Sequence, residues 1–418
     1  MDQFQLRDGS YHCDSLPLND LGQSVGTPAY IYSKQMLEEH CSALLDAFKN
    51  YPTDACFAVK SLSNLSILKT IFAAGLGADL VSAGELQRAL LAGAPTNRIV
   101  FSGVGKQEDE VRQALKAGIL MFNVESPFEI DMIAGLAAAA NKTAAISLRI
   151  NPNIDAQTNA KITTGLYSTK FGLTETDLPD LLNRIRSQPS LQLVGLACHI
   201  GSQILDLAPL KEAAQQMASL SKHVRELGFD LRYLNMGGGL GIRYSNEEPP
   251  SVTEYAEALI QGVRPTGLRL IIEPGRSLVG NIGVLLTRVI SVKKTPERHF
   301  VVVDAAMNDL IRPTLYESYH TISAVNATAP NAPAALCDIV GPICESGDFL
   351  GKDRQMPLPV AGELLMVRGC GAYGSSMASQ YNSRPRAPEV FVDGATFRII
   401  RQRETLESLW ANELPGLR

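Results

Sequence analysis

A lysine stands at the point where an apolar run of the sequence ends. Lys60 follows Cys56–Val59 and precedes the mostly polar stretch Ser61–Asn64, so its amine is expected where a buried strand reaches the surface. A lysine attacks a carbonyl carbon only when burial or a neighbouring cation lowers its pKa, because the protonated ammonium is not a nucleophile. Lys60 is therefore a candidate for covalent attachment to an aldehyde. The alternative is an exposed lysine that ends a strand.

Three consecutive glycines form a second candidate site. At Gly237, Gly238 and Gly239 the absence of side chains lets an anion such as phosphate approach the backbone N–H groups closely. The alternative is a tight turn that binds nothing. The chain has no GxGxxG motif followed by an acidic residue, which argues against a dinucleotide as the ligand.

Glu273 ends the apolar run Leu270–Ile272, where an unpaired carboxylate would cost several kcal/mol, so we expect it to have a charged partner. That partner is either Arg276 or a protonated heterocyclic nitrogen. In the second case the planar guanidinium of Arg276 is available to bind a substrate carboxylate through two hydrogen bonds. His199 lies near Ser202 at the end of another apolar run and is either a packed core histidine or a side chain that stacks on a flat ring.

A thiol and a carboxylate are adjacent in a glycine-flanked segment, residues 341–348. Cys344 could donate a proton to a carbanion, and Glu345 could pair with a substrate ammonium. The alternative is a β-turn with an inert cysteine. Tyr316 and Tyr373 are similarly open, because each could be a packing residue or a ligand-binding residue.

Short apolar runs rich in β-branched residues alternate with helix-like stretches between about residues 54 and 280. Eight such units over about 250 residues are typical of a closed (β/α)₈ barrel, and a doubly wound open sheet is the competing architecture. The eight runs are Asp54–Lys60, Ala78–Ser82, Ile99–Gly103, Leu120–Val124, Ala144–Asn151, Leu193–His199, Leu234–Gly239 and Leu268–Glu273.

The candidate residues coincide with these runs. Catalytic groups of barrel enzymes lie at the C-terminal ends of the strands, and phosphate sites often use the loops after strands seven and eight. The triple glycine ends the seventh run, which favours the phosphate site over the empty turn. Glu273, Gly275 and Arg276 end or follow the eighth run, and Asp79 lies within the second.

The remaining sequence predicts a second domain. After Gly283 the sequence pattern changes to β-rich runs linked by proline-rich turns, which indicates an all-β domain of sandwich or barrel type. Residues 1–30 are too short to fold alone and are expected to add strands to it. We therefore predict that residues 1–30 form N-terminal strands, that residues 31–283 form the (β/α)₈ barrel, and that residues 284–418 form the β-domain.

Composition restricts the partners. The 418 residues carry a formal net charge of -5 and show no block of lysine and arginine, so nucleic acid and anionic membranes are not expected partners. The N-terminus has no signal-peptide pattern and no apolar stretch is long enough to cross a bilayer, so we expect a cytoplasmic protein. Seven cysteines without CxxC spacing argue against a disulfide framework and a zinc site.

Together, the strand-end lysine, the phosphate loop, the carboxylate for a ring nitrogen and the histidine for a ring face match the parts of pyridoxal 5'-phosphate (PLP). This cofactor acts as an electron sink for the carbanion left when an amino acid loses its α-carboxylate or α-proton. PLP is therefore the expected cofactor.

The chain resembles the fold type III, alanine-racemase-like PLP-dependent decarboxylases, and among them those that act on diaminopimelate. The resemblance runs nearly end to end. Its motifs are Phe57–Lys60, Asn123–Ser126, Lys170–Gly172, His199–Gln203, Gly237–Gly241, Glu273–Arg276, Arg312–Tyr316, Gly341–Asp348 and Tyr373–Ser379.

The resemblance implies a role for each matched residue. For the cofactor, it implies that Lys60 binds PLP covalently and His199 stacks on the ring, with Asp79, Ser202, Gly237, Gly238, Gly239, Glu273, Gly275, Arg276 and Tyr373 also in the cofactor site. For the substrate, it implies that Arg276, Arg312 and Tyr316 bind a distal carboxylate, with Tyr373 beside them and Glu345 on the distal ammonium. Cys344 would be the proton donor. Its loop would enter the active site of a second subunit, which implies a homodimer.

The implied reaction is decarboxylation of meso-2,6-diaminopimelate to L-lysine and CO₂, a step of lysine biosynthesis. Decarboxylases of ornithine, lysine or arginine on the same fold have no distal carboxylate to bind and are the nearest alternative. A PLP-binding homeostasis protein without turnover is a further alternative, but such proteins lack a second β-domain. Two segments depart from the family pattern, Ser61-Leu62 and Thr158–Ile162, and both concern substrate range and loop closure.

Overall fold

The computed structural model describes residues 2–156, 159, 161, 164–327 and 332–417. The chain divides into two compact units. The barrel unit comprises His40–Ile242 and Glu248–Ser277, and the β unit comprises Met1–Glu39, Arg243–Glu247 and Leu278–Arg418. The segment Thr158–Ile162, which departs from the family pattern, lies largely outside the described residues.

The described residues of the barrel unit form a closed barrel of eight parallel strands, as the sequence predicts. The order is β5 to β12 around the barrel, closed by pairing of β12 with β5. The strands are β5 (Thr53–Ala58), β6 (Gly77–Leu80), β7 (Ile99–Phe101), β8 (Met121–Val124), β9 (Ala144–Arg149), β10 (Leu191–Ala197), β11 (Tyr233–Asn235) and β12 (Arg269–Ile272).

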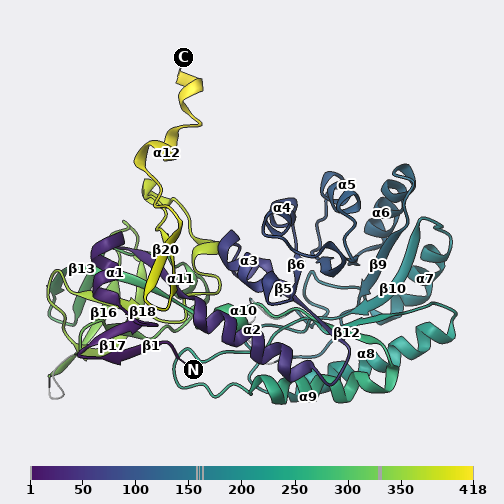
Figure 1. Ribbon diagram of the computed structural model, residues 1–418, viewed down its shortest axis with the longest axis horizontal. Helices are drawn as coiled ribbons and strands as arrows, with labels where there is room; N and C mark the ends of the chain where they lie inside the picture. Colours follow the sequence, from purple (N-terminus) through teal and green to yellow (C-terminus); the bar gives the residue numbers. More distant parts are fainter. Residues whose placement is uncertain (1, 157–158, 160, 162–163, 328–331, 418) are drawn as a thin grey trace. The chain divides into compact units, whose positions relative to one another are not determined.

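Helices surround this barrel, and Figure 1 shows α4, α5 and α6 side by side along its outer face. Their ends follow local sequence signals. Ser82 and Ser126 cap the N-termini of α4 and α6, while Gly118 adopts the left-handed conformation that ends α5. The helices are α2 (Lys34–Phe48), α3 (Leu65–Ala73), α4 (Ala83–Leu91), α5 (Glu108–Ala117), α6 (Pro127–Ala139), α7 (Leu178–Arg186), α8 (Ala208–Glu226), α9 (Val252–Val263) and α10 (Arg276–Val279).

The β unit contains a sheet of nine strands among the described residues, mostly antiparallel, and a small sheet of β1, β2 and β3. β4 lies between β13 and β19 in the large sheet, so a strand near residue 30 belongs to this unit. The strands are β1 (Phe4–Arg7), β2 (Ser10–Cys13), β3 (Leu16–Pro17), β4 (Ala29–Ser33), β13 (Gly283–Lys294), β14 (His299–Val303), β15 (Ile322–Ala324), β16 (Ala334–Val340), β17 (Phe349–Pro357), β18 (Leu364–Val367), β19 (Glu389–Asp393) and β20 (Thr396–Arg401).

In the described part of the β unit, the sheets are accompanied by the helices α1 (Leu18–Val25), α11 (Arg312–Tyr316) and α12 (Leu406–Trp410). The predicted fold class, a (β/α)₈ barrel with a second β-rich domain, is confirmed. Among the described residues, no helix combines the length and apolarity that crossing a bilayer requires.

Candidate active site

Lys60 lies in a short turn, Val59–Ser61, directly after β5. Its Nζ is 3.6 Å from Oδ2 of Asp79 in β6, and the side chain of Asp79 is almost fully buried. The hydroxyl of Ser61 donates to the carbonyl of Ala58 at 2.7 Å and so fixes the turn that carries the lysine. Ser61, one of the two residues that depart from the family pattern after Lys60, therefore has a local structural role.

Asp79 contributes a buried carboxylate with an unsatisfied atom. Its Oδ1 has no hydrogen-bond partner among the described residues. A buried acceptor without a partner is costly, and such atoms in native proteins commonly mark a functional site or a bound group. The atom lies on the carboxylate that pairs with Lys60, where the sequence predicts a cofactor.

Glu273, directly after β12, is oriented by two amides. Its Oε1 accepts from Nδ2 of Asn235 at 2.6 Å and from Nδ2 of Asn123 at 3.2 Å. Burial, reinforced by the charge of Asp79, raises the pKa of Glu273 to about 7, while the Asn235 hydrogen bond and the charge of Lys60 act in the opposite direction. A cationic ring nitrogen beside Glu273 would lower this pKa and keep the carboxylate charged at neutral pH.

The triple glycine passes so close to neighbouring atoms that side chains do not fit. A Cβ on Gly237, which has a φ of +64°, would lie 2.7 Å from Nδ1 of His199, and a Cβ on Gly238 would lie 2.2 Å from the carbonyl oxygen of Glu273. The glycines therefore allow the loop after β11 to approach both His199 and Glu273. The sequence accounts for this requirement, since only glycine leaves the necessary space.

His199 is uncharged in this environment. Burial, together with the positive charges of Arg149 and Lys60, places the pKa of His199 well below its usual value. The N–H of Gly238 donates to Nδ1 of His199 at 3.2 Å, so the ring proton is on Nε2. A neutral imidazole held in this way can lie against a flat aromatic ring without repelling a protonated nitrogen of that ring.

Arg276 and Ser202 are in direct contact. Nη2 and Nε of Arg276 donate to the hydroxyl of Ser202 at 3.1 and 3.3 Å, and Arg276 is buried. Gly275 packs against Ala58 and Ser61, so a Cβ at this position would lie 3.1 Å from the Cβ of Ala58. The barrel unit therefore gathers Lys60, Asp79, His199, Ser202, Gly237–Gly239, Glu273, Gly275 and Arg276 around its C-terminal strand ends.

The β unit brings its own predicted residues together. Thr314 of α11, the helix that carries Arg312 and Tyr316, donates to the carbonyl of Gly347 at 2.5 Å. This bond connects α11 to the segment that contains the two functional candidates Cys344 and Glu345.

Tyr381 and Asn382 hold that segment from another side. The hydroxyl of Tyr381 donates to Glu345 at 2.8 Å, and the backbone N–H of Cys344 donates to Oδ1 of Asn382 at 3.2 Å. Cys344 is exposed. Tyr373, the remaining predicted residue of this unit, has a left-handed backbone with a φ of 57°.

Comparison with known proteins identifies the family of this chain. The model of the family "Pyridoxal-dependent decarboxylase, pyridoxal binding domain" matches residues 34–280. A diaminopimelate decarboxylase of Neisseria meningitidis serogroup A is 49% identical over 405 residues, which cover 97% of this chain and 99% of the relative. The chain belongs to the diaminopimelate decarboxylase family.

Solved structures of the diaminopimelate decarboxylase family agree in fold. The enzyme from Helicobacter pylori in complex with L-lysine is 43% identical, with a TM-score of 0.92 over 96% of this chain and 100% of that chain. The enzyme from M. jannaschii in co-complex with L-lysine is 34% identical, with a TM-score of 0.94 over 100% of this chain and 99% of that chain. The chain is a PLP-dependent decarboxylase, as the sequence predicts.

The barrel residues fit PLP, the cofactor of this decarboxylase family. Asp79 offers a buried oxygen without a partner among the described residues, the glycine loop lies close against His199 and Glu273, and the environment of Glu273 would accept a cation. Lys60 would hold the cofactor's aldehyde carbon, the glycine loop and Ser202 its phosphate, and Glu273 its ring nitrogen. These individual roles are proposals.

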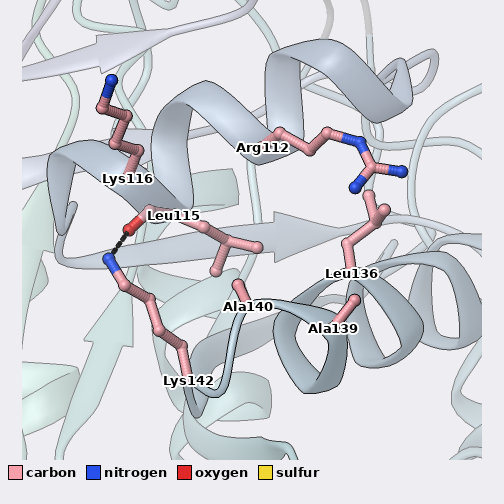
Figure 2. Close-up of a pocket in the computed structure, with 7 residues that line it drawn as sticks. All are labelled: Arg112, Leu115, Lys116, Leu136, Ala139, Ala140 and Lys142. Carbon is pink, nitrogen blue, oxygen red and sulfur yellow. Dashed lines mark hydrogen bonds between the residues drawn. The ribbon is translucent and has the colours of Figure 1, made fainter.

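A surface hollow of about 260 Å³ lies between α5 and α6, and none of the residues that line it is a predicted site residue (Figure 2). Two of its three cations already have partners: Arg112 pairs with Glu108 at 3.1 Å, and the Lys142 amine donates to the carbonyl of Leu115. The hollow is therefore explained as a gap between two helices, at which Lys142 stabilises the C-terminal turn of α5.

Sequence reasoning assigned no role to the residues that orient Glu273, although Asn123 begins one of the family motifs. Asn235 is the last residue of β11 and Asn123 lies within β8, where both side chains are buried. The available signal was an amide inside an otherwise apolar strand, which demands a hydrogen-bond partner when buried. The partner itself is distant in sequence and could not be identified from the pattern.

Proposed function

We propose that this chain decarboxylates meso-2,6-diaminopimelate to L-lysine and CO₂ with PLP as its cofactor. The observation that carries the proposal is the contact of α11, which bears Arg312 and Tyr316, with the Cys344–Glu345 segment. The two segments carry a cation that can bind a carboxylate, Arg312, and a carboxylate that can bind an ammonium, Glu345. The distal end of meso-diaminopimelate carries both of these groups, whereas ornithine carries only the ammonium.

When bound, PLP supplies an electron sink for the electron pair released as CO₂ leaves. Lys60 would hold the cofactor through its side-chain amine. Glu273, as a carboxylate, keeps the cofactor's ring nitrogen protonated, and neutral His199 supports the ring face. The thiol of Cys344 then donates its proton to the carbon that has lost CO₂, and solvent restores the thiol.

The substrate is tested by measuring CO₂ release from purified protein with PLP and, separately, meso-diaminopimelate, L-ornithine and L-lysine. We expect release from meso-diaminopimelate and little from the other two. Release from ornithine alone would refute the substrate assignment. No release from any of the three, with PLP bound, would favour a cofactor-binding protein without turnover.

The role of Cys344 is tested by Cys344→Ala. The variant should bind PLP with an unchanged absorbance spectrum and lose most of its turnover, because only the proton-donating step depends on the thiol. Cys344→Ser is the matched control. Its hydroxyl has a similar size but is a much weaker acid, so this variant should lose turnover as well. Wild-type turnover in Cys344→Ala would remove Cys344 as the donor.

We also propose that the chain acts as a cytoplasmic homodimer in which Cys344 and Glu345 serve the partner's active site. Their exposure on the β unit supports this. Mixing inactive Lys60→Ala with inactive Cys344→Ala should restore up to about a quarter of wild-type activity, because a mixed dimer has one site without either substitution. No recovery after verified subunit exchange would mean that each chain builds its own site.

A further inference from the structure

Arg312 of α11 is held by a buried histidine that neither the sequence motifs nor the proposed chemistry includes. Nη1 of Arg312 donates to Nε2 of His320 at 2.8 Å. Arg312 is 4% exposed and His320 is fully buried, so the contact is shielded from water. A hydrogen bond to a charged group in such surroundings fixes the position of that group strongly.

The second ring nitrogen determines which form of His320 is present. Nδ1 lies 2.8 Å from the carbonyl oxygen of Arg368, an acceptor, so Nδ1 carries the proton. Nε2 therefore keeps its lone pair and accepts from Arg312. A protonated His320 could not accept this bond and would repel the guanidinium, so the ring is neutral where the contact exists.

Two further neighbours restrict the guanidinium. The ring of Tyr244 lies under it, with 4.7 Å between Cζ of Arg312 and the ring centroid, and the same ring meets His320 edge to face at 5.2 Å. The hydroxyl of Ser318 accepts from Nη2 at 3.3 Å. None of these three neighbours carries a charge, so they orient the guanidinium without neutralising it.

We infer that His320 is a positioning residue that aims the guanidinium of Arg312 at the distal carboxylate of the substrate. This inference rests on the proposed function, in which Arg312 binds that carboxylate. His320 itself touches neither substrate nor cofactor in this scheme. Its effect should therefore fall on ligands that have the distal carboxylate and spare those that lack it.

L-lysine and cadaverine form the appropriate pair of probes. L-lysine, the proposed product, retains the distal carboxylate, and cadaverine is the same diamine without it. Both are tested as competitive inhibitors of the PLP-loaded enzyme. His320→Leu removes the acceptor for Arg312, whereas His320→Gln places an amide oxygen near the position of Nε2 and can restore the bond. Both variants lose the N–H that His320 donates to the carbonyl of Arg368, so this loss cancels when the Leu and Gln variants are compared with each other.

In His320→Leu we expect inhibition by L-lysine to weaken roughly ten- to hundredfold, the cost of losing a hydrogen bond to a charged group. Inhibition by cadaverine should change less than about twofold, well below that cost. His320→Gln should recover most of the affinity for L-lysine. Equal losses for both inhibitors, or equal affinities for L-lysine in the Leu and Gln variants, would overturn the inference.

Arg312→Gln separates failure of this inference from failure of the proposed function. If Arg312→Gln leaves inhibition by L-lysine unchanged, Arg312 does not bind the carboxylate and the proposed function fails at this point. If it weakens inhibition while His320→Leu does not, only the positioning role of His320 is wrong. If His320→Leu fails to fold, Ser318→Ala serves as a second variant, because it removes another acceptor of Arg312. It must weaken inhibition by L-lysine and leave inhibition by cadaverine unchanged.

Discussion

The charge of Glu273 makes the stability of the cofactor-free protein depend on pH in a predictable direction. The pKa of Glu273 rises from 4.5 to about 7 in the folded chain, chiefly because the carboxyl group is buried. The folded state therefore binds a proton more tightly than the unfolded chain does. Stability contributed by the protonated group is present below about pH 4.5 and falls as pH rises, until both states are ionised above about pH 7.

The size of this effect follows from the shift. Each pKa unit corresponds to 1.36 kcal/mol, so the ionised Glu273 destabilises the cofactor-free fold by about 3 kcal/mol at pH 8. About 2.5 kcal/mol of this develops between pH 5 and pH 8. Glu273→Gln carries no charge at either pH and keeps an oxygen that can accept from Asn235, so it should not show this loss.

The measurement is urea denaturation of the cofactor-free wild type and of Glu273→Gln at pH 5 and pH 8. Circular dichroism follows the helices, because most of them belong to the barrel unit and the one tryptophan, Trp410, does not. Burial also raises the pKa of Glu85 and of Asp309 to about 7, and both residues are present in both proteins. The difference between the two proteins therefore isolates Glu273.

Relative to Glu273→Gln, the wild type should lose about 2.5 kcal/mol between pH 5 and pH 8. Saturating PLP should remove most of this relative loss, since a protonated ring nitrogen beside Glu273 stabilises its charged form. An identical pH dependence of the two cofactor-free proteins would refute the reasoning, because Glu273 would then titrate at its ordinary pKa in the fold.

Three further perturbations test other parts of the site. Borohydride reduction in the presence of PLP should attach a phosphopyridoxyl group that peptide mass analysis finds on Lys60 and that is absent from Lys60→Ala. Gly238→Ala should weaken PLP binding by about tenfold or more in equilibrium dialysis, because the new Cβ meets backbone, whereas Gly135→Ala, with open space around it, should not. Arg149→Met leaves Glu125 buried without its 2.9 Å partner and should lower the unfolding free energy by about 3 kcal/mol, and adding Glu125→Gln should recover part of that loss.

The barrel could be predicted from sequence because its strands are buried on both faces. Such strands read as continuous apolar runs, and all eight runs correspond to observed strands. Strands such as β16, β17 and β20 are harder to recognise in the sequence, because their residues are partly exposed and mix charged with apolar side chains. Helix α7 has an apolar face formed by Leu178, Leu181, Leu182 and Ile185, but the sequence analysis assigned no helix to these residues.

The partners of the site residues were beyond the reach of sequence patterns. Lys60 and Asp79 could be placed at neighbouring strand ends, and the structure brings them to 3.6 Å. The bond from Arg312 to His320 depends on a left-handed residue, Glu317 (φ 55°), that ends α11 and lets the following chain double back. Such reversals are local backbone events that leave no periodic signal, so His320 did not stand out among the six histidines.

The residues proposed for the cofactor's aldehyde and ring nitrogen lie in a different unit from Arg312 and Glu345, which are proposed for the distal end of the substrate. The residues proposed to hold PLP through its aldehyde and ring nitrogen, Lys60 and Glu273, take their hydrogen-bond and ion-pair partners from the barrel unit. Two of the residues proposed to recognise the distal end of the substrate, Arg312 and Glu345, take the partners described above from the β unit. Substitutions around Arg312 should therefore change which amino acid is accepted without weakening PLP binding, because no contact that orients Glu273 passes through them.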